Sequence, residues 1–167
     1  TAAIAVGLPY VATCSFDTAG RTMMGLMPGS LADVLAVEPV PPLAMGANCG
    51  VGAPDILVSL LEMEGCVHPL VTKGNCGVPH FEGTEIVYSG TPELMARYAT
   101  AAINAGAQIV GGCCGTTPTH IAAMREAIDA HTPGERPTIE TIINMVGALT
   151  NSAPSATVER RSRRSQG

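Results

Sequence analysis

The stretch that decides the fold is Ile109-Val110-Gly111-Gly112-Cys113-Cys114-Gly115-Thr116-Thr117-Pro118. Residues 107–110 are apolar except for Gln108 and partly β-branched, which indicates a buried strand. Thr117 and Pro118 are typical of a helix start, with Thr as the N-cap and Pro at the first helical position. The cysteine pair is therefore predicted at the carboxyl end of a strand, the edge at which α/β folds bind their ligands.

The same pattern of a strand followed by a helix occurs four times along the chain. Strands are predicted to begin near residues 8, 43, 68 and 107, a loop is expected over residues 78–90, and a last helix is expected within residues 137–149. Four β-α units with functional groups at the strand ends favour an α/β fold that is half of a (β/α)8 TIM barrel. A doubly wound open sheet is the structural alternative. Such a sheet would not require functional groups at three separate strand ends, so the barrel is favoured.

Composition narrows the class of protein. The chain has 167 residues, of which 46% are apolar, 3% aromatic and 14% charged, and its net charge is −5. The negative charge and the few aromatic side chains argue against nucleic acid as a partner. No apolar run approaches the roughly 20 residues of a membrane span, and no signal peptide is recognised, so we expect six reduced cysteines in the cytoplasm. Because the chain begins with Thr in an Ala-rich stretch, we expect that an N-terminal part is missing.

Three predicted strand ends carry similar short sequences: Gly46-Ala47-Asn48-Cys49-Gly50, Lys73-Gly74-Asn75-Cys76-Gly77 and Gly111-Gly112-Cys113-Cys114-Gly115. In a barrel the strand ends surround one mouth, so we expect these thiols to converge. Cys49, Cys113 and Cys114 would supply three sulfur ligands, the number that a catalytic zinc ion takes while keeping a fourth position open for substrate. A substrate thiol in that position would lose its proton and become a nucleophile at neutral pH.

These three motifs, together with Thr116-Thr117-Pro118 and His120-Ile121, resemble the homocysteine S-methyltransferases. That family includes the homocysteine domain of cobalamin-dependent methionine synthase and betaine–homocysteine methyltransferase. The resemblance covers roughly residues 8–130 and implies that residues 1–150 are the C-terminal half of a homocysteine-binding barrel, strands five to eight. Residues 151–167 are expected to be a disordered basic tail.

The resemblance implies an activity and a set of ligands. The expected reaction is zinc-dependent methyl transfer to the thiol of homocysteine in methionine biosynthesis, with Zn²⁺ held by Cys49, Cys113 and Cys114. The methyl donor would be betaine-like, or a methylcobalamin or methylfolate carried by a partner module such as a corrinoid protein. No catalytic side chain is expected beyond the activation of the substrate thiol by zinc.

Other polar side chains near the mouth are weaker candidates. Asn48 and Asn75 precede thiols and could bind substrate or orient their loops, and Asp17 could meet the amino group of the substrate or cap a loop. The family pattern Lys-Pro-Asn-Ala-Gly is replaced here by Lys-Gly-Asn-Cys-Gly, so Cys76 is either a spare thiol at the mouth or a substitute for Ala. His120, in the first turn of a helix, is expected to be structural.

Two further interpretations compete with the enzyme. In the first, the chain is a non-catalytic, zinc-binding half-barrel that needs a partner, because an open half-barrel exposes two sheet edges. An N-terminal half-barrel or a second copy of the chain would cover those edges. In the second, the vicinal thiols serve redox chemistry or metal storage, but the chain lacks a Cys-x-x-Cys motif.

Overall fold

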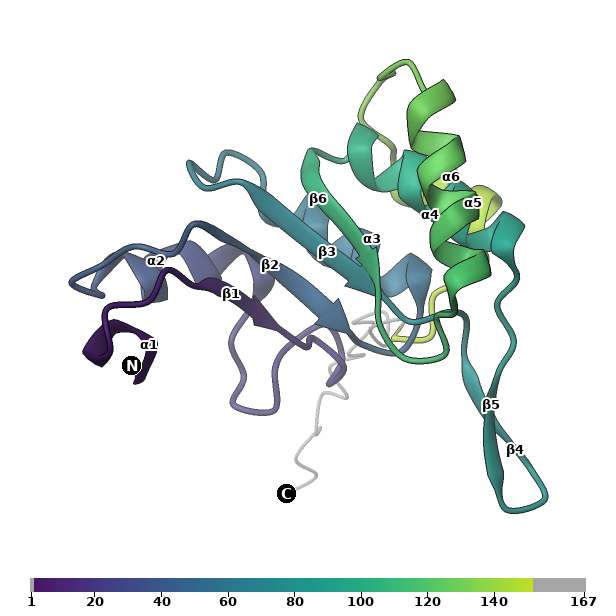
Figure 1. The fold of residues 1–167 in the computed structure, drawn as a ribbon, viewed down its shortest axis with the longest axis horizontal. Helices are drawn as coiled ribbons and strands as arrows, with labels where there is room; N and C mark the ends of the chain where they lie inside the picture. Colours follow the sequence, from purple (N-terminus) through teal and green to yellow (C-terminus); the bar gives the residue numbers. More distant parts are fainter. Residues whose placement is uncertain (1, 152–167) are drawn as a thin grey trace, which may run out of the picture.

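The computed structural model describes residues 2–151, and its core is a parallel four-stranded sheet covered by helices (Figure 1). In chain order the elements are α1 (Ala2–Ala5), β1 (Val11–Cys14), η1 (Pro28–Ser30), α2 (Leu31–Ala36), β2 (Ala44–Cys49), α3 (Ala53–Leu61), β3 (Leu70–Gly74), β4 (Pro79–Glu82), β5 (Glu85–Tyr88), α4 (Pro92–Asn104), β6 (Ala107–Gly112), α5 (Pro118–Ala130) and α6 (Ile139–Val146).

The strand order distinguishes the two fold classes that the sequence left open. The sheet runs β1-β2-β3-β6, so its neighbours follow chain order, and every pair is parallel. A doubly wound sheet reverses its strand order at a switch point, whereas a barrel adds each β-α unit beside the previous one. The described chain therefore consists of four consecutive β-α units of the (β/α)8 type, which confirms the predicted fold class.

The core lies between the two central strands and helices α3, α4 and α6. Residues 44–47 of β2 and 70–72 of β3 are buried, whereas the edge strands β1 and β6 are partly exposed. Apolar side chains at helical spacing explain this arrangement, since Leu57, Leu60, Met95 and Ile142 are fully buried. Arg136 links the C-terminal ends of α3 and α4. It donates to the carbonyl oxygens of Leu61 (2.9 Å) at the end of α3 and Ala105 (2.8 Å) at the end of α4.

The main correction to the predicted elements is the segment expected to be a loop over residues 78–90. It contains the antiparallel hairpin of β4 and β5, which projects from the body beyond the end of β3 (Figure 1). The four predicted β-α units and the last helix occur, with β1 beginning at Val11 rather than near residue 8, whereas the short helix α1 was not predicted. Of the predicted basic tail, residues 152–167 lie outside the described part of the chain.

Candidate metal centre

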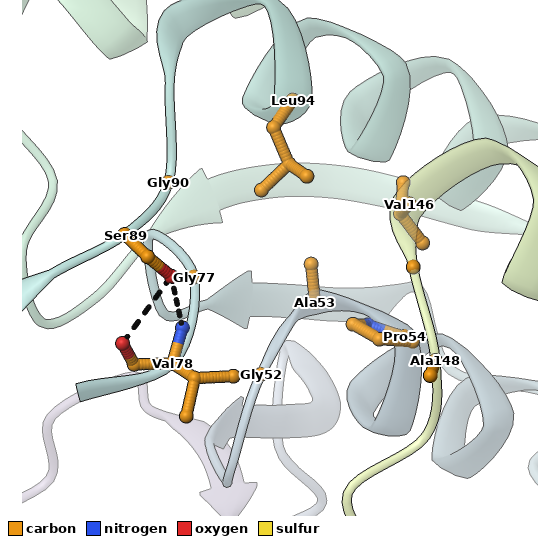
Figure 2. A pocket seen from close by; sticks show the side chains of 11 residues that line it. Gly52, Ala53, Pro54, Gly77, Val78, Ser89, Gly90, Leu94, Val146 and Ala148 are labelled. Carbon is orange, nitrogen blue, oxygen red and sulfur yellow. Dashed lines mark hydrogen bonds between the residues drawn. The ribbon is translucent and has the colours of Figure 1, made fainter. Parts of the chain in front are cut away.

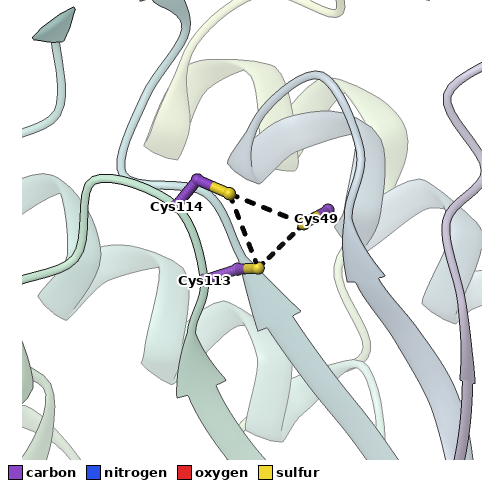
Figure 3. Close-up of side chains that lie close together, drawn as sticks. All are labelled: Cys49, Cys113 and Cys114. Atoms are coloured by element: carbon purple, nitrogen blue, oxygen red, sulfur yellow. Dashed lines mark hydrogen bonds between the residues drawn. The ribbon is translucent and has the colours of Figure 1, made fainter. Parts of the chain in front are cut away.

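Three cysteine side chains from two strand ends meet at the carboxyl edge of the sheet (Figure 3). Cys49 is the last residue of β2, and Cys113 and Cys114 follow β6 directly. The Sγ atom of Cys49 lies 2.8 Å from that of Cys113 and 3.7 Å from that of Cys114, and the remaining pair is 3.9 Å apart. Within residues 2–151 this is the one group of three or more His, Cys, Asp or Glu side chains placed to hold a metal ion.

The backbone at both strand ends turns sharply to bring the thiols together. Cys49 has φ +56° and is followed by Gly50 at φ +71°, while Gly115 after the cysteine pair has φ +75°. A non-glycine residue in this left-handed region is uncommon, and such strain persists where the surrounding structure holds it, often at functional sites. Gly50 and Gly115 adopt these left-handed conformations readily because glycine has no side chain.

Asn75 connects the two loops that carry the cysteines. Its Nδ2 donates to the carbonyl oxygen of Gly50 (2.8 Å), and its Oδ1 accepts from the backbone N–H of Cys114 (3.1 Å). Asn75 is only 5% exposed, so both hydrogen bonds are largely shielded from solvent. Asn75 therefore holds the end of β2 and the cysteine pair at a fixed separation, across the end of β3.

Backbone hydrogen bonds add to this support. The N–H of Cys113 donates to the carbonyl oxygen of Gly74 (2.8 Å), and the N–H of Cys76 donates to that of Cys114 (2.9 Å). Beneath them, the fully buried Tyr98 of α4 accepts from the N–H of Gly74 (2.9 Å). The cysteine pair thus rests on the end of β3, which in turn rests on α4.

The thiols influence one another's ionisation. Burial, followed by the hydrogen bonds to Cys113 and Cys114, raises the pKa of the Cys49 thiol to about 12, and a hydrogen bond from Asn48 opposes this increase. Burial also disfavours the thiolate of Cys113, but the hydrogen bonds from Cys49 and Cys114 outweigh it and lower the pKa of Cys113. Cys113 therefore gives up its proton more readily than Cys49 does.

The donor set fits a soft divalent metal ion. Zinc–sulfur bonds of about 2.3 Å in a tetrahedral site place the sulfurs about 3.8 Å apart. Two of the three sulfur–sulfur distances are close to this value, and only the Cys49–Cys113 pair has to separate further. Three thiolates with no fourth protein ligand in the group match a site that keeps one position open.

The weaker candidates occupy different places around this centre. Asn48 directly precedes Cys49 in β2 and lines a small cavity together with Gly50 and Asp55. Asp17 accepts from the hydroxyl groups of Ser15 (3.3 Å) and Thr18 (3.4 Å), and Ser15 accepts from the N–H of Gly50 (3.2 Å). Asp17 is therefore connected to the rim through Ser15 and makes the contacts of a loop cap.

The remaining cysteines and His120 lie apart from the three thiols. Cys76 is fully buried in the hydrophobic core, which corresponds to the substitute for Ala rather than to a spare thiol at the mouth. Cys14 and Cys66 are half-buried against that core. His120 accepts from the N–H of Thr117 through Nδ1 (3.1 Å) and so caps α5, in agreement with the structural role expected for it.

One residue beside the centre escaped the sequence analysis. The side chain of Tyr88, the last residue of β5, lies against Gly115, the residue directly after Cys114. It was passed over because residues 78–90 were expected to be a loop. The run Glu85-Ile86-Val87-Tyr88 after Gly83 was the available signal, since β-branched and aromatic residues beyond a glycine turn are typical of a hairpin.

A separate pocket of about 150 Å³ lies between the start of α3, the base of the hairpin and the end of α6 (Figure 2). It is lined by residues 52–54, 77–78, 89–90, 94 and 146–148, mostly through apolar atoms. The hydroxyl of Ser89 closes one side by hydrogen bonding to the backbone of Val78. None of the three clustered cysteines lines this pocket, so the pocket is separate from the candidate metal centre.

Comparison with known proteins places the chain in a known group. The family model described as homocysteine S-methyltransferase matches residues 1–128. Two solved structures of the Escherichia coli homocysteine methyltransferase MmuM are similar at 25% sequence identity. The metallated form has a TM-score of 0.57 and the apo form 0.58. The match covers 74% of this chain and 38% of the metallated structure, and 75% and 42% for the apo form, so this chain spans about two fifths of the length of those proteins. Across residues 2–151, no helix combines the length and the apolar character needed to cross a membrane.

Proposed function

This chain belongs to the homocysteine S-methyltransferase family, and from that premise we propose that Cys49, Cys113 and Cys114 hold one zinc ion that activates the thiol of homocysteine. The observation that carries the proposal is the meeting of three thiols from strand ends 64 and 65 residues apart in the sequence. The two strands that carry these cysteines are separated by β3, yet their ends direct three sulfurs at one point, and all three residues are free cysteines.

Zinc held by three thiolates supplies a Lewis acid that lowers the pKa of a thiol at its open position. The protein's own contribution is to hold the three sulfurs in place before the substrate arrives. Asn75 fixes the two loops relative to each other, and Asn48 stabilises charge on the sulfur of Cys49 by hydrogen bonding. Asn48, Asn75 and Asp17 also stay our candidates for contacts to homocysteine, of which Asn48 directly precedes a clustered cysteine.

The proposed reaction is a displacement at a methyl carbon. The thiolate of homocysteine attacks the methyl group, a carbon–sulfur bond forms, and the bond between the methyl carbon and the donor breaks with its electrons passing to the donor. The product is methionine, which places the protein in methionine biosynthesis. The donor is either a betaine-like onium compound or a methylcobalamin or methylfolate presented by a partner module. Reduced thiols at the centre fit the cytoplasm, where disulfides are rare.

A specific observation supports a second candidate function, a zinc-binding half-barrel that becomes active with a partner chain. The sheet ends at β1 and β6 without further pairing in the described residues, and Val11 and Ile109 on these strands are 48% and 46% exposed. Since the chain spans about two fifths of the MmuM structures, an N-terminal half-barrel or a second copy would complete the enzyme.

Zinc content per chain tests the proposed function first. We expect about one zinc ion per chain by elemental analysis under reducing conditions, and its loss in Cys113→Ala/Cys114→Ala. Cys66→Ala is the matched control, because Cys66 lies outside the cluster and its thiol donates to the sulfur of Met45. A zinc-free wild-type chain in metal-replete buffer would contradict the site.

A methyl-transfer assay then separates the two candidates. Formation of methionine from homocysteine and a donor by the chain alone supports the enzyme. Zinc binding without methyl transfer supports the half-barrel that needs a partner, provided that methyl transfer appears when the first half of a family barrel is added.

A further inference from the structure

Lys73 is the only lysine of the chain, and it lies near the carboxyl end of β3. The residue is half-buried, yet within residues 2–151 its ammonium group takes part in no hydrogen bond or ion pair. Arg97, Arg125 and Arg136, by contrast, each donate to an oxygen atom of the protein. A charge that is partly removed from water is normally offset by a hydrogen-bonding or charged partner. The charge of Lys73 is therefore left for an anion that is not part of the described chain.

The side chain of Lys73 lies on the face of the sheet that the helices do not cover. The hydroxyl of Thr72 is hydrogen-bonded to that of Tyr98 in α4 (2.8 Å), and a Cβ atom at Gly74 would lie 3.1 Å from the same ring. Positions 72 and 74 thus face α4, and because side chains alternate along a strand, Lys73 faces the other way. Its Cγ atom lies 3.5 Å from the place of a Cβ atom at Gly111, so its stem leans over β6 on this face. In a barrel this is the face that the strands enclose.

The position of Lys73 along β3 places it beside the metal centre. The next residue, Gly74, pairs in register with Cys49 of β2. The carbonyl oxygen of Gly74 also accepts from the N–H of Cys113 (2.8 Å). Lys73 is thus one residue from the point on β3 that both cysteine-bearing strand ends contact. An anion bound to Lys73 on the open face would therefore lie close to the three sulfurs.

The neighbours of Lys73 in the described sheet are uncharged. Its register partners are Asn48 on β2 and Gly111 on β6. Asp17 follows β1, two strands away, and accepts there from two hydroxyl groups. No acidic side chain of the adjacent strands therefore competes with an incoming anion for Lys73.

The substrate proposed above carries a matching anion. Homocysteine has a carboxylate and an amino group at the end of a short carbon chain that begins at its thiol. With the thiol on the metal ion, both charged groups have to lie near the strand ends. Lys73 attracts the carboxylate and repels the ammonium group, so it would also decide which way the amino acid turns. An ammonium group has three donors and forms charge-assisted hydrogen bonds with a carboxylate.

We propose that the ammonium group of Lys73 binds the carboxylate of the amino acid whose thiol occupies the open position of the metal ion. The inference rests on the proposed function, because it assumes that a thiol substrate binds at the three cysteines. It deepens that function by giving the site a preference for thiols that carry a carboxylate over thiols that do not.

The first test compares three thiols on the Co²⁺-loaded chain, whose thiolate-to-metal charge-transfer absorption reports the binding of a further thiol. Mercaptobutyrate is homocysteine without its amino group, and aminopropanethiol is homocysteine without its carboxylate. Lys73→Met keeps an unbranched stem against Gly111 and removes the charge. We expect the dissociation constants of homocysteine and mercaptobutyrate to rise about tenfold in Lys73→Met, because both lose a charge-assisted hydrogen bond. The dissociation constant of aminopropanethiol should not rise.

Arg125→Met is the matched control, because it also removes one positive charge from the chain. Arg125 lies on α5 and is paired with Asp129 of the same helix. Its substitution should leave the dissociation constants of all three thiols unchanged.

A second measurement keeps Lys73 in place. Reductive methylation with ¹³C-labelled formaldehyde modifies Lys73 as the one lysine, and so gives one side-chain NMR signal beside that of the amino terminus. Mercaptobutyrate should shift this signal, and aminopropanethiol at the same concentration should not.

The outcomes separate this proposal from the proposed function. Equal changes for thiols with and without a carboxylate in Lys73→Met, or changes no larger than those in Arg125→Met, overturn the role of Lys73 and leave the metal centre intact. A wild-type chain that binds no Co²⁺ overturns the metal centre. The NMR signal then decides on Lys73 alone, since a shift with mercaptobutyrate only supports the carboxylate position and an unmoved signal overturns it. A signal that moves only when the first half of a family barrel is added assigns Lys73 to an acidic side chain of that half and overturns the substrate carboxylate as its partner.

Discussion

The side-chain oxygen of Asn75 accepts a hydrogen bond from the backbone N–H of Cys114 at 3.1 Å, although the two residues are 39 positions apart. The same amide group donates to Gly50, directly after Cys49. One buried side chain therefore joins all the backbone that carries the clustered thiols. Its position directly after β3, the strand between β2 and β6, makes this possible, since β3 pairs with both.

Asn75→Ala should weaken metal binding more than it weakens the fold. The substitution removes both hydrogen bonds, so the two cysteine loops lose their fixed separation. We expect the dissociation constant for Zn²⁺ to rise about 10- to 100-fold and the free energy of unfolding of the metal-free chain to fall by about 1–3 kcal/mol. Competition with a chromophoric chelator measures the first quantity, and urea denaturation measures the second.

Asn104→Ala is the control for this substitution. Asn104 also makes two side-chain hydrogen bonds, accepting from His131 (2.8 Å) and from the N–H of Gly134 (2.9 Å), but it lies at the end of α4. Asn104→Ala should lower the free energy of unfolding without changing the affinity for Zn²⁺. Equal metal affinities in Asn75→Ala and Asn104→Ala would contradict the role of Asn75 as the link between the loops.

Metal binding should strengthen as the pH rises. Burial and the hydrogen bonds to its neighbours raise the pKa of Cys49 to about 12, so this thiol holds a proton at neutral pH. The metal ion binds thiolate and must displace that proton, and a higher pH makes the displacement easier. We expect the apparent affinity for Zn²⁺ to increase by at least about tenfold per pH unit between about pH 6 and 8. Titrations in a pH series, with proton release followed by an indicator dye, measure this, and a pH-independent affinity would contradict it.

The cysteines should differ widely in their reactivity toward an alkylating reagent. Cys114 is exposed, whereas Cys76 is fully buried and burial raises the pKa of its thiol. Because the thiolate is the reactive form, Cys76 should react last and Cys114 early in the metal-free native chain. Zinc should protect Cys114 but leave the rate at Cys66 unchanged. Peptide mapping by mass spectrometry gives each rate, and early modification of Cys76 would contradict the buried placement.

The order of the β-α units could be predicted because each depends on local patterns. Short apolar strands bounded by glycines and the Thr-Pro start of α5 are visible in a single window of sequence. The hairpin over residues 79–88 was missed because its strands are mostly exposed and carry no alternation of buried and exposed positions. Its tip is also the only part of the segment with a clear turn signal, at Gly83.

The same difference between local and distant information applies to the metal centre. Cys49, Cys113 and Cys114 could be proposed because each stands at a predicted strand end, and the structure brings their sulfurs together. The partners of Asn75 could not be predicted, since they depend on the register of β3 between two strands. In this register Lys73 faces Asn48 on one side and Gly111 on the other, and Asn75 follows just beyond. The contact between Tyr88 and Gly115 depends in addition on where the hairpin leaves the sheet.

Tyr98→Phe should test how far the metal centre depends on the core beneath it. The hydroxyl of Tyr98 is fully buried, forms a hydrogen bond with Thr72 (2.8 Å) and accepts from the N–H of Gly74 (2.9 Å). Phenylalanine would keep the packing but leave both partners without a hydrogen bond, so the free energy of unfolding should fall by about 1–3 kcal/mol. Thermal and urea denaturation measure this loss, and Tyr10→Phe, which removes an exposed hydroxyl, should lose less. Because the carbonyl oxygen of Gly74 still accepts from Cys113, metal affinity should fall by less than in Asn75→Ala. A variant as stable as the wild type would show that Thr72 and Gly74 find other partners, and the support of the cysteine pair by α4 would then rest on packing alone.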